Sequence, residues 1–380
     1  MNRPSADDQT FAIFAGGGTA GHIVPGLAVA TELVRRGKTA SQCLFVGSAR
    51  GMERELVPDA GFPVELLPGR GIQRKLTWQN VGAIWGLLRA IFKGIGIVRK
   101  QRPQVVVVLG GYASLACIIG AVLWRVPLVV MEQNARAGAA SRLAARFAKR
   151  CCVPFTETDL PKKVVTGNPV RKEVLAVSRA TQRDAARSSL NVDGNRRLIA
   201  VVTGSLGARK VNEAVFAAVE LLADRDDLSV YHVVGSRDWD KWSQRLPSPD
   251  GLQYQAVRYE NHMENVLAAA DLLISRAGGS TVAEVAQVGI ASILIPLPNA
   301  PRDHQTANAQ ALVAVGAARC LADQELNGER LVNELQTLLE QDGQLERMAQ
   351  AAKSLAVDDP AARVADVIDE VVDEVSRGKS

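Results

Sequence analysis

The sequence predicts an α/β protein with two doubly wound domains, and three observations support this fold class. Four apolar runs each end in glycines and lead into a helical pattern, within residues 11–37, 105–123, 198–222 and 272–289. Continuous rather than alternating apolar strands are typical of a parallel sheet that helices cover on both faces. Two such units fall in each half of the 380-residue chain, and that length favours two domains.

Composition agrees with a folded protein, because 47% of the residues are apolar and 22% are charged. The five cysteines are odd in number and show no CxxC spacing, which indicates a reducing compartment rather than a disulfide framework. The first ten residues carry two aspartates and no apolar segment, so we expect no secretory signal.

Charge is distributed unevenly along the chain. Residues 1–170 hold 22 Lys and Arg against 10 Asp and Glu, a net charge of +12, whereas the remaining residues have a net charge of −7. The first half is therefore the one that would attract an anionic partner, such as a lipid surface, a nucleic acid or a phosphorylated substrate.

The boundary between the domains is expected where proline, glycine and charge interrupt the pattern at residues 161–171. We divide the chain into a first domain over residues 1–167 and a second over 168–357. Residues 358–380 form an amphipathic helix after a proline, which can pack back on the first domain.

Each glycine turn that feeds a helix presents backbone N–H groups at the positive end of the helix dipole, a combination that favours phosphate. No GxxxxGK[ST] motif occurs, which argues against an ATPase or GTPase, and "GGGTAGH" is no clean dinucleotide fingerprint. Four such turns at the carboxyl ends of parallel strands predict a ligand between the two domains.

Two polar residues in these turns have both a structural and a functional interpretation. His22 ends the first turn, where it is either a polar cap or a general base for a hydroxyl. Glu284 completes a "TVAE" capping box with Thr281, which by itself would explain it. Capping does not explain Arg276 beside two glycines, nor the polar residues 296–312 after the next strand, a set suited to a ribose, a sugar and a diphosphate.

Neither of the two DxD sequences, at 224–226 and 238–240, follows a convincing buried strand, and no His, Cys and carboxylate cluster stands elsewhere. We therefore predict no metal.

Residues 78–100 combine an apolar face, Trp85 to Ile95, with Arg and Lys around it. This pattern fits a helix lying on an anionic membrane surface, or a helix packed in the core.

In their order along the chain, the motifs closely resemble the MurG family, the N-acetylglucosamine transferases of peptidoglycan synthesis. The resemblance rests on "GGGTAGHIVPGLAVA", "GGYAS", "EQN", "GNPVR", "TGSLGARKVN", "SRAGGSTVAE" and "IPLPNAPRDHQTANA", spread from residue 15 to about 312. It implies a GT-B fold, in which two Rossmann-like domains face a cleft. It also implies transfer of N-acetylglucosamine from UDP-N-acetylglucosamine to the C4 hydroxyl of lipid I, with inversion, to give lipid II.

The resemblance further implies roles for individual residues, with His22 as the base. Contacts to the acceptor are implied for Gly17, Gly18, Thr19, Gly21, Gly110, Gly111 and Tyr112, and contacts to the donor for Asn134, Arg171, Ser205, Met263, Arg276, Gly278, Gly279, Glu284, His304, Gln305 and Asn308. No cofactor, no metal and no nucleic acid are implied. The resemblance places the protein at the cytoplasmic face of the inner membrane, where proteins of cell-wall synthesis or cell division would be partners.

Two departures from the family pattern concern the site. Met131 stands before "EQN" where the family usually has histidine, and Thr203 stands where a glycine is usual. The base is either His22 or Glu132. Two other functions remain open: a UDP-N-acetylglucosamine 2-epimerase, and a non-catalytic UDP-sugar sensor.

Overall fold

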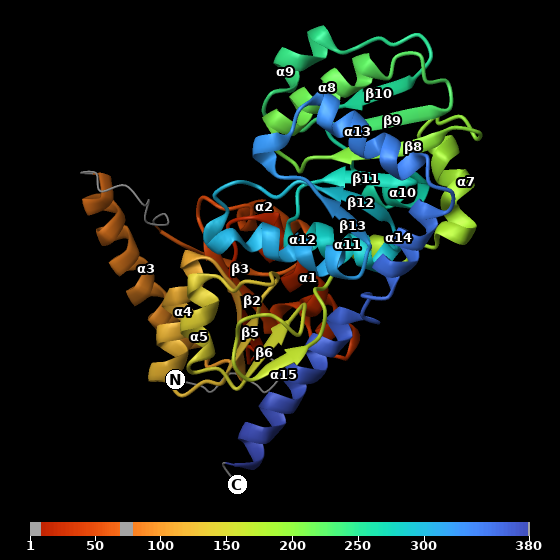
Figure 1. The fold of residues 1–380 in the computed structure, drawn as a ribbon. Helices are drawn as coiled ribbons and strands as arrows, with labels where there is room; N and C mark the ends of the chain where they lie inside the picture. The colour runs from red at the N-terminus through yellow and green to blue at the C-terminus, as the bar shows by residue number, and fades with distance from the viewer. Residues whose placement is uncertain (1–8, 69–78, 379–380) are drawn as a thin grey trace. The chain divides into compact units, whose positions relative to one another are not determined.

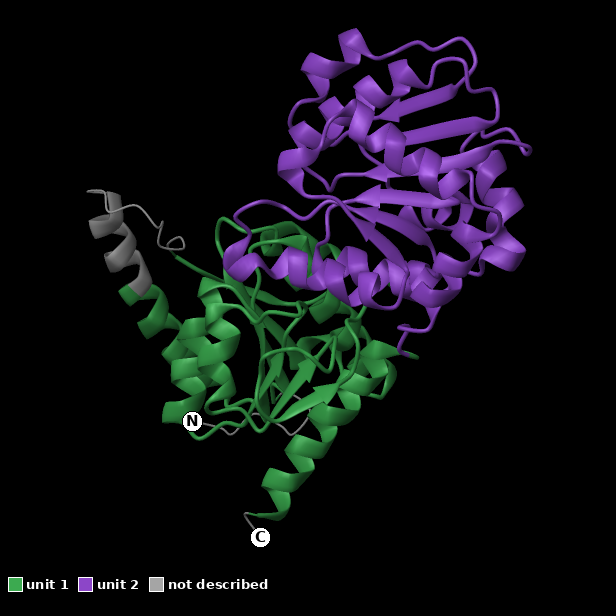
Figure 2. Cartoon of the chain, viewed as in Figure 1, with its two compact units in different colours: residues 1–171, 358–380 green, residues 172–357 purple. Residues whose placement is uncertain are grey.

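The computed structural model describes residues 9–68 and 79–378, with side chains 79–87 left out of the description. The chain divides into two compact units (Figure 2). Unit 1 comprises Met1–Arg171 together with Asp358–Ser380, and unit 2 comprises Lys172–Val357. Each unit has its own sheet and its own hydrophobic core.

Unit 1 is built on a parallel sheet with strand order β3-β2-β1-β4-β5-β6-β7 (Figure 1). Its strands are β1 (Ala12–Gly16), β2 (Cys43–Ser48), β3 (Val64–Leu67), β4 (Val105–Gly110), β5 (Leu128–Met131), β6 (Arg150–Val153) and β7 (Lys163–Val165). Its helices are α1 (Ala20–Arg35), α2 (Glu53–Asp59), α3 (Gln79–Gln101), α4 (Tyr112–Leu123), α5 (Ala139–Ala145) and α15 (Pro360–Arg377). The strand order reverses direction between β1 and β4, which makes that position the topological switch point.

Both faces of this sheet are covered, as continuous apolar strands require. Successive residues of β4 alternate between two cores: Val106 and Val108 pack with α3, α4 and α5, whereas Val105 and Val107 pack with α1 and α15. The alternation follows from the two-residue period of a strand. The strand predicted from the run at residue 105 is therefore buried on both sides.

Helix α15 returns the end of the chain to unit 1. Val364, Ile368 and Val371 share one face of the helix and are buried in the core that also contains α1 residues. Arg36, just after α1, pairs with Asp366 at 2.7 Å, and its guanidinium also donates to the carbonyl oxygen of Ala362 at 3.0 Å. Apolar packing and an ion pair together hold this helix on unit 1.

Unit 2 repeats the architecture with the order β10-β9-β8-β11-β12-β13, again all parallel. Its strands are β8 (Arg197–Val202), β9 (Leu228–Val233), β10 (Gln253–Val257), β11 (Leu272–Ser275), β12 (Ala291–Leu294) and β13 (Ala318–Cys320). Its helices are α6 (Lys172–Leu175), α7 (Arg179–Ser189), α8 (Arg209–Leu221), α9 (Trp239–Trp242), α10 (Met263–Ala269), α11 (Gly279–Val288), α12 (His304–Ala314), α13 (Gly328–Leu339) and α14 (Gln344–Lys353). Its switch point lies between β8 and β11.

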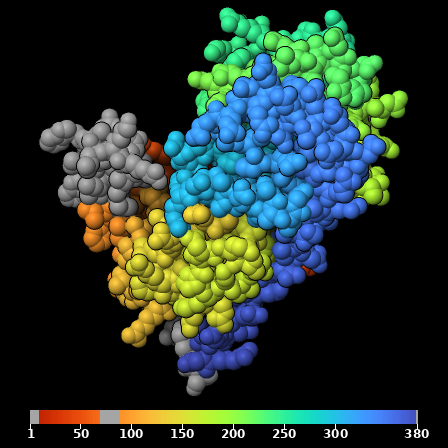
Figure 3. Space-filling model, viewed as in Figure 1, coloured from red at the N-terminus to blue at the C-terminus, as the bar shows by residue number. Residues whose placement is uncertain are grey.

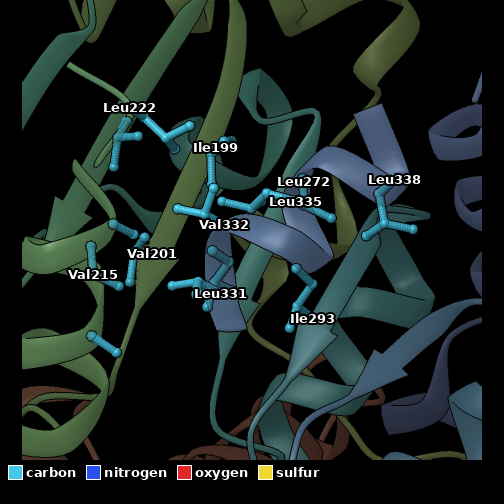
Figure 4. Close-up of a cluster of buried hydrophobic side chains, with 14 of the residues drawn as sticks. Ile199, Val201, Val215, Leu222, Leu272, Ile293, Leu331, Val332, Leu335 and Leu338 are labelled. Carbon is cyan, nitrogen blue, oxygen red and sulfur yellow. The ribbon is translucent and has the colours of Figure 1, made fainter. Parts of the chain in front are cut away.

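One core of unit 2 joins α8 and α13 to the central strands. Figure 4 shows Ile199 and Val201 of β8 among leucine and valine side chains of α13. In the space-filling view the side chains of α13 and α14 cover this face of unit 2 (Figure 3). Two parallel, doubly wound sheets confirm the predicted fold class.

Among the described residues, none of the helices is both long and apolar enough to cross a membrane. Much of the predicted membrane contact at residues 78–100, including Trp85, lies outside the side chains that the structure describes. In the described part of α3, Phe92 is 72% exposed while Ala90, Ile97 and Val98 are buried. This helix therefore has one face in the core and at least one large apolar side chain in solvent.

Candidate active site

The first two glycine turns meet at the switch point of unit 1. Gly16, at the end of β1, pairs in register with Gly110, at the end of β4. The N–H of Gly17 donates to the carbonyl oxygen of Gly110 at 3.1 Å. A Cβ atom at Gly16 would lie 2.1 Å from that same oxygen, and one at Gly111 would lie 2.6 Å from the carbonyl oxygen of Gly17. Glycine is required at these positions because the two backbones touch.

His22 lies in the first turn of α1, and its imidazole lies close to Gly110 of the second glycine turn. Its Nδ1 is 2.9 Å from the hydroxyl oxygen of Thr19, the N-cap residue of the helix. A Cβ atom at Gly110 would lie 3.2 Å from the imidazole Cδ2. The imidazole is therefore held between a hydroxyl and a glycine, a position in which a side chain at residue 110 would displace it.

Two backbone N–H groups near His22 already donate hydrogen bonds to other residues of unit 1. The N–H of Gly18 donates to Oε1 of Glu53 at 2.8 Å, and that of Gly17 is bonded to Gly110. The first residues of a helix have N–H groups without an intrahelical acceptor, and here these belong to the turn that contains Gly21. Any phosphate at this turn would find its donors in the start of α1.

Glu53 is a residue that the sequence analysis missed. It is the first residue of α2, is 1% exposed, and accepts a second hydrogen bond from the N–H of Ser48 at 3.0 Å. Gly17, Gly47 and Gly51 surround its side chain, since a Cβ atom at any of them would lie within 3 Å of a Glu53 atom. The feature of the sequence that could have pointed to Glu53 is Gly51 in "ARGMERE", two residues before this glutamate.

Tyr112 begins α4, directly after Gly111. Its hydroxyl donates to the side-chain oxygen of Ser48 at 3.2 Å, so the residue that Glu53 binds through its backbone also holds Tyr112. The structure thus brings His22, Tyr112 and both glycine turns together at one edge of the unit 1 sheet.

Glu132 follows β5 and organises its own loop. Its Oε1 accepts from the N–H of Gln133 at 3.0 Å and from Nδ2 of Asn134 at 3.0 Å, and its Oε2 accepts from the N–H of Gly138 at 3.1 Å. The residue is 4% exposed. Met131, at the position where the family usually has histidine, is 1% exposed and packs in the core beneath α1 and α15.

In unit 2, the turn after β8 is bonded to the turn after β9. The carbonyl oxygen of Ser205 accepts from the N–H of Ser236 at 3.0 Å, and a Cβ atom at Gly207 would lie 2.2 Å from the carbonyl oxygen of Val234. Ser205 itself is exposed. The loop is therefore fixed in place while its serine faces solvent.

A buried polar network lies behind this turn. The hydroxyl of Thr203 and Nε2 of His232 lie 3.3 and 3.1 Å from Oδ1 of Asn212, whose Nδ2 donates to the carbonyl oxygen of Val234 at 2.9 Å. Nδ1 of His232 lies 3.1 Å from the hydroxyl of Tyr254. Burial lowers the pKa of His232 to about 3, so the imidazole is neutral. Thr203, which stands where the family that the sequence resembles usually has a glycine, takes part in this network through its hydroxyl.

Helix α11 starts at Gly279 with Gly278 as its N-cap, and no side chain caps it. The predicted capping box is wrong, because Thr281 is the third helical residue rather than the N-cap. Glu284 lies one turn further along the helix and is partly exposed. The capping explanation of this glutamate is therefore removed.

Arg276 bridges two loops of unit 2. Its guanidinium donates to the carbonyl oxygens of Ile295 and Pro296, each at 3.1 Å, and pairs with Asp323 at 2.7 Å. It thus holds the segment after β12 against the end of β11. Its contact with a donor phosphate stays a prediction.

The loop before α12 holds three residues in the left-handed region: Asn299, Arg302 and Asp303, with φ of 62°, 58° and 54°. Non-glycine residues in this region store strain, which concentrates at functional sites. Asn308, buried in α12, donates to the carbonyl oxygen of Ala277 at 3.1 Å and ties the helix to the turn before α11.

The neighbouring residues of α12 are also anchored. Oε1 of Gln305 accepts from the N–H of Leu297 at 2.9 Å, and Nδ1 of His304 lies 2.9 Å from the carbonyl oxygen of Pro301.

Two further residues of the predicted donor site lie elsewhere in the chain. Met263 starts α10, and Arg171 is the last residue of the first segment of unit 1. The unit 2 residues thus lie after β8, β10, β11 and β12, at the carboxyl edge of one sheet.

Within residues 9–68 and 79–378, no group of three or more His, Cys, Asp and Glu side chains is arranged to hold a metal ion. Asp238, from one of the two DxD sequences, pairs with Arg209 at 2.7 Å and with Arg237 at 3.1 Å. Its carboxylate is thus engaged by two arginines.

Two family models match the chain: the glycosyltransferase family 28 N-terminal domain over residues 12–153, and the glycosyltransferase family 28 C-terminal domain over residues 198–364. A protein of Acetivibrio thermocellus is 33% identical over 373 residues, which cover 96% of this chain and 99% of that protein. Its name is UDP-N-acetylglucosamine–N-acetylmuramyl-(pentapeptide) pyrophosphoryl-undecaprenol N-acetylglucosamine transferase. A protein of the same name from Moorella thermoacetica is 37% identical over 353 residues, 90% of this chain and 94% of that protein.

Solved structures agree with this likeness. The crystal structure of Acinetobacter baumannii MurG superposes with a TM-score of 0.77 at 29% identity, covering 95% of this chain and 99% of that chain. A UDP-GlcNAc 2-epimerase from Neisseria meningitidis, bound to UDP-GlcNAc, superposes with a TM-score of 0.65 at 15% identity, covering 96% and 99%. At that identity the second likeness concerns the fold alone.

Proposed function

This chain belongs to the family of UDP-N-acetylglucosamine–N-acetylmuramyl-(pentapeptide) pyrophosphoryl-undecaprenol N-acetylglucosamine transferases, and we propose that it binds the acceptor on unit 1 and the donor on unit 2. The enzyme moves N-acetylglucosamine from UDP-N-acetylglucosamine to lipid I and forms lipid II, a step of peptidoglycan precursor synthesis. The observation that carries this function is the likeness over nearly the whole length of relatives named for that transfer.

His22 is the proposed general base. An imidazole removes the proton from the C4 hydroxyl of the acceptor as the oxygen attacks the anomeric carbon, from the face opposite to UDP, which inverts that carbon. For Nε2 to be the basic nitrogen, Nδ1 must carry the hydrogen and donate to the hydroxyl oxygen of Thr19, the contact measured at 2.9 Å. The Thr19 hydroxyl can accept that hydrogen bond, so the contact is compatible with the tautomer that the reaction requires.

The structure favours His22 over Glu132 as the base. Both carboxylate oxygens of Glu132 accept hydrogen bonds from N–H groups of its own loop, at 3.0 to 3.1 Å. Both oxygens are therefore engaged by donors of the loop itself rather than reserved for a substrate hydroxyl. We assign Glu132 to the shape of the loop that presents Asn134.

Unit 2 is the proposed donor site. The start of α11 at Gly278 and Gly279 would accept the UDP diphosphate together with Ser205, because free N–H groups and the helix dipole favour an anion. Glu284 would accept hydrogen bonds from the ribose hydroxyls, and His304, Gln305 and Asn308 would shape the sugar subsite. Met263 would lie near the uracil.

Charge on the departing UDP would be stabilised by the same helix start and by Arg171, with no metal ion required. N–H groups that are already oriented cost no reorganisation when the bond to the sugar breaks. This proposal predicts a reaction that chelators do not inhibit.

The acceptor carries a lipid chain, and we propose that α3 is where unit 1 meets the membrane. Among its described side chains, Leu88 and Phe92 are exposed, and Arg89 and Lys100 of the same helix are also exposed. Exposed apolar and basic side chains on one helix favour an anionic lipid surface. A peripheral position at the cytoplasmic face of the inner membrane, in proximity to proteins of wall synthesis and division, belongs to the same proposal.

The epimerase has less support, because its likeness at 15% identity extends only to the fold. A non-catalytic UDP-sugar sensor would retain the donor loops and would not need an imidazole supported by Thr19. The measurement that separates the transferase from both alternatives is transfer of radiolabelled N-acetylglucosamine from its UDP donor to a lipid I analogue, with and without EDTA. Product insensitive to EDTA supports the transferase; donor binding without product would overturn it and favour the sensor or epimerase.

A further inference from the structure

Glu53 occupies a position that a purely structural role does not explain. It is 1% exposed, and within the described part of the chain its Oε2 has no hydrogen-bond partner. A buried carboxyl oxygen without a partner carries a cost in folding free energy. Oε1 accepts both hydrogen bonds of this side chain, from the N–H groups of Gly18 and Ser48, so the effect of Glu53 on its neighbours passes through that oxygen.

Two chains of contacts lead from Oε1 of Glu53 to residues of the proposed acceptor site. The first passes through the N–H of Gly18, at 2.8 Å, to Thr19 and from its hydroxyl to Nδ1 of His22, at 2.9 Å. The second passes through the N–H of Ser48, at 3.0 Å, and from the Ser48 hydroxyl to Tyr112, at 3.2 Å. One oxygen atom therefore holds both the turn before the base and the residue that binds Tyr112.

The glycines around Glu53 leave room for this carboxyl group and for little else. A Cβ atom at Gly17 would lie 2.3 Å from Oε1, and one at Gly51 would lie 1.8 Å from Oε2. The glycine-rich character of residues 16–18 and 47–51 thus serves in part to admit a buried side chain.

We propose that Glu53 is a positioning residue for the transfer reaction. Its carboxyl group fixes the Gly16–Gly18 turn and Ser48, and through them the places of His22 and Tyr112. This inference rests on the proposed role of unit 1 as the site of the acceptor and the base.

The primary test compares Glu53→Ala, Glu53→Gln and the exposed control Glu55→Ala in the full-length enzyme. We expect Glu53→Ala to lower kcat about 10- to 100-fold, while KM for UDP-N-acetylglucosamine changes less than twofold, because the hydrogen bonds of Glu53 are to Gly18 and Ser48 and not to residues of the proposed donor site. Glu53→Gln retains an acceptor oxygen and should recover most of the loss, and Glu55→Ala should match the wild type. A Glu53→Ala enzyme with wild-type kcat would overturn the proposal, as would a loss confined to KM for the donor.

A double-substitution cycle provides a second test that does not depend on removing Glu53 alone. Gly51→Ala should lower kcat, since the new Cβ must displace Oε2, but should have little further effect in the Glu53→Ala background. Gly194→Ala, where a Cβ would have no atom within 4 Å, is the control. Equal effects of Gly51→Ala in both backgrounds would contradict the proposed contact.

A third readout is independent of the reaction. The imidazole resonance of His22, assigned by its loss in His22→Ala, should titrate at a different pH in Glu53→Ala and Gly51→Ala than in the wild type and Glu53→Gln. An unchanged titration would overturn the positioning role whether or not the protein proves to be the proposed transferase. Failure to make lipid II by the wild type, with this shift present, would instead refute only the proposed function.

Discussion

The hydroxyl oxygen of Thr19 lies 2.9 Å from Nδ1 of His22, and both residues belong to the start of α1. If Nδ1 donates its hydrogen to this hydroxyl, Nε2 is the nitrogen without a hydrogen, which is the form that the proposed base requires. A capping residue of the helix and the proposed catalytic residue thus act together.

Replacement of Thr19 tests this contact. We expect Thr19→Val to lower kcat about fivefold, which corresponds to one hydrogen bond worth about 1 kcal/mol. Thr19→Ser retains the hydroxyl and should restore most of the activity. The measurement is kcat at saturating donor and acceptor. If valine and serine give equal rates, the hydroxyl does not support His22.

Removal of the imidazole tests the base itself. His22→Ala should lower transfer at least about 100-fold, within the usual range for losing a general base, and leave UDP affinity nearly unchanged because the proposed partner of His22 is the acceptor hydroxyl and not UDP. Transfer kinetics and calorimetric UDP titration measure the two quantities. The exposed His262→Ala serves as the control. Near-wild-type transfer by His22→Ala would remove this residue from the mechanism.

Glu284 tests the donor site. Because α11 is capped at Gly278 and not by Thr281, Glu284→Ala should weaken UDP binding without a comparable loss of stability. Gln287→Ala, a partly exposed residue of the same helix, is the matched control. UDP affinity and the unfolding midpoint are measured for both variants. A drop in stability with unchanged UDP affinity would show that the glutamate serves the fold alone.

The buried His232 predicts how stability depends on pH. Burial lowers its pKa to about 3, whereas the value in an unfolded chain is about 6.5. The unfolded state therefore binds the proton first, so the stability contributed by neutral His232 is complete above about pH 6.5 and is lost as the pH falls toward 3. The loss can reach about 1.4 kcal/mol for each pH unit within that window.

Urea unfolding at pH 7 and pH 5 measures this dependence. His232→Gln should be less stable than the wild type at pH 7, because it disturbs the network with Asn212 and Tyr254, but should lose less stability between the two pH values. His262→Gln, at an exposed position, should retain the wild-type dependence. A His232→Gln protein with the wild-type dependence would refute the assignment.

Much of the fold could be predicted from the sequence because its signals are local. The apolar runs before each glycine turn became β1, β4, β8 and β11, which are the central strands of two parallel sheets. A strand buried on both faces has to be apolar along its length, so a short continuous apolar run that ends in glycines indicates it. The family likewise followed from ordered short motifs.

The partners of the polar residues depended on tertiary structure. "TVAE" has the pattern of a capping box, yet the helix starts two residues before Thr281, because backbone conformation at Gly278 decides where it begins. Arg276 has the composition of a phosphate ligand, yet it pairs with Asp323, which is distant in sequence. No local pattern contains such a partner.

Glu53 shows most clearly what the sequence determined and what only the fold decided. The sequence determined two doubly wound domains, glycine turns at strand ends, and the family of the chain. Parallel pairing of β1 with β2 and β4 then brought Gly17, Ser48 and Tyr112 around one buried carboxyl group. Strand pairing joins segments that lie far apart along the chain, and the contacts that it creates exist only once the sheet has formed.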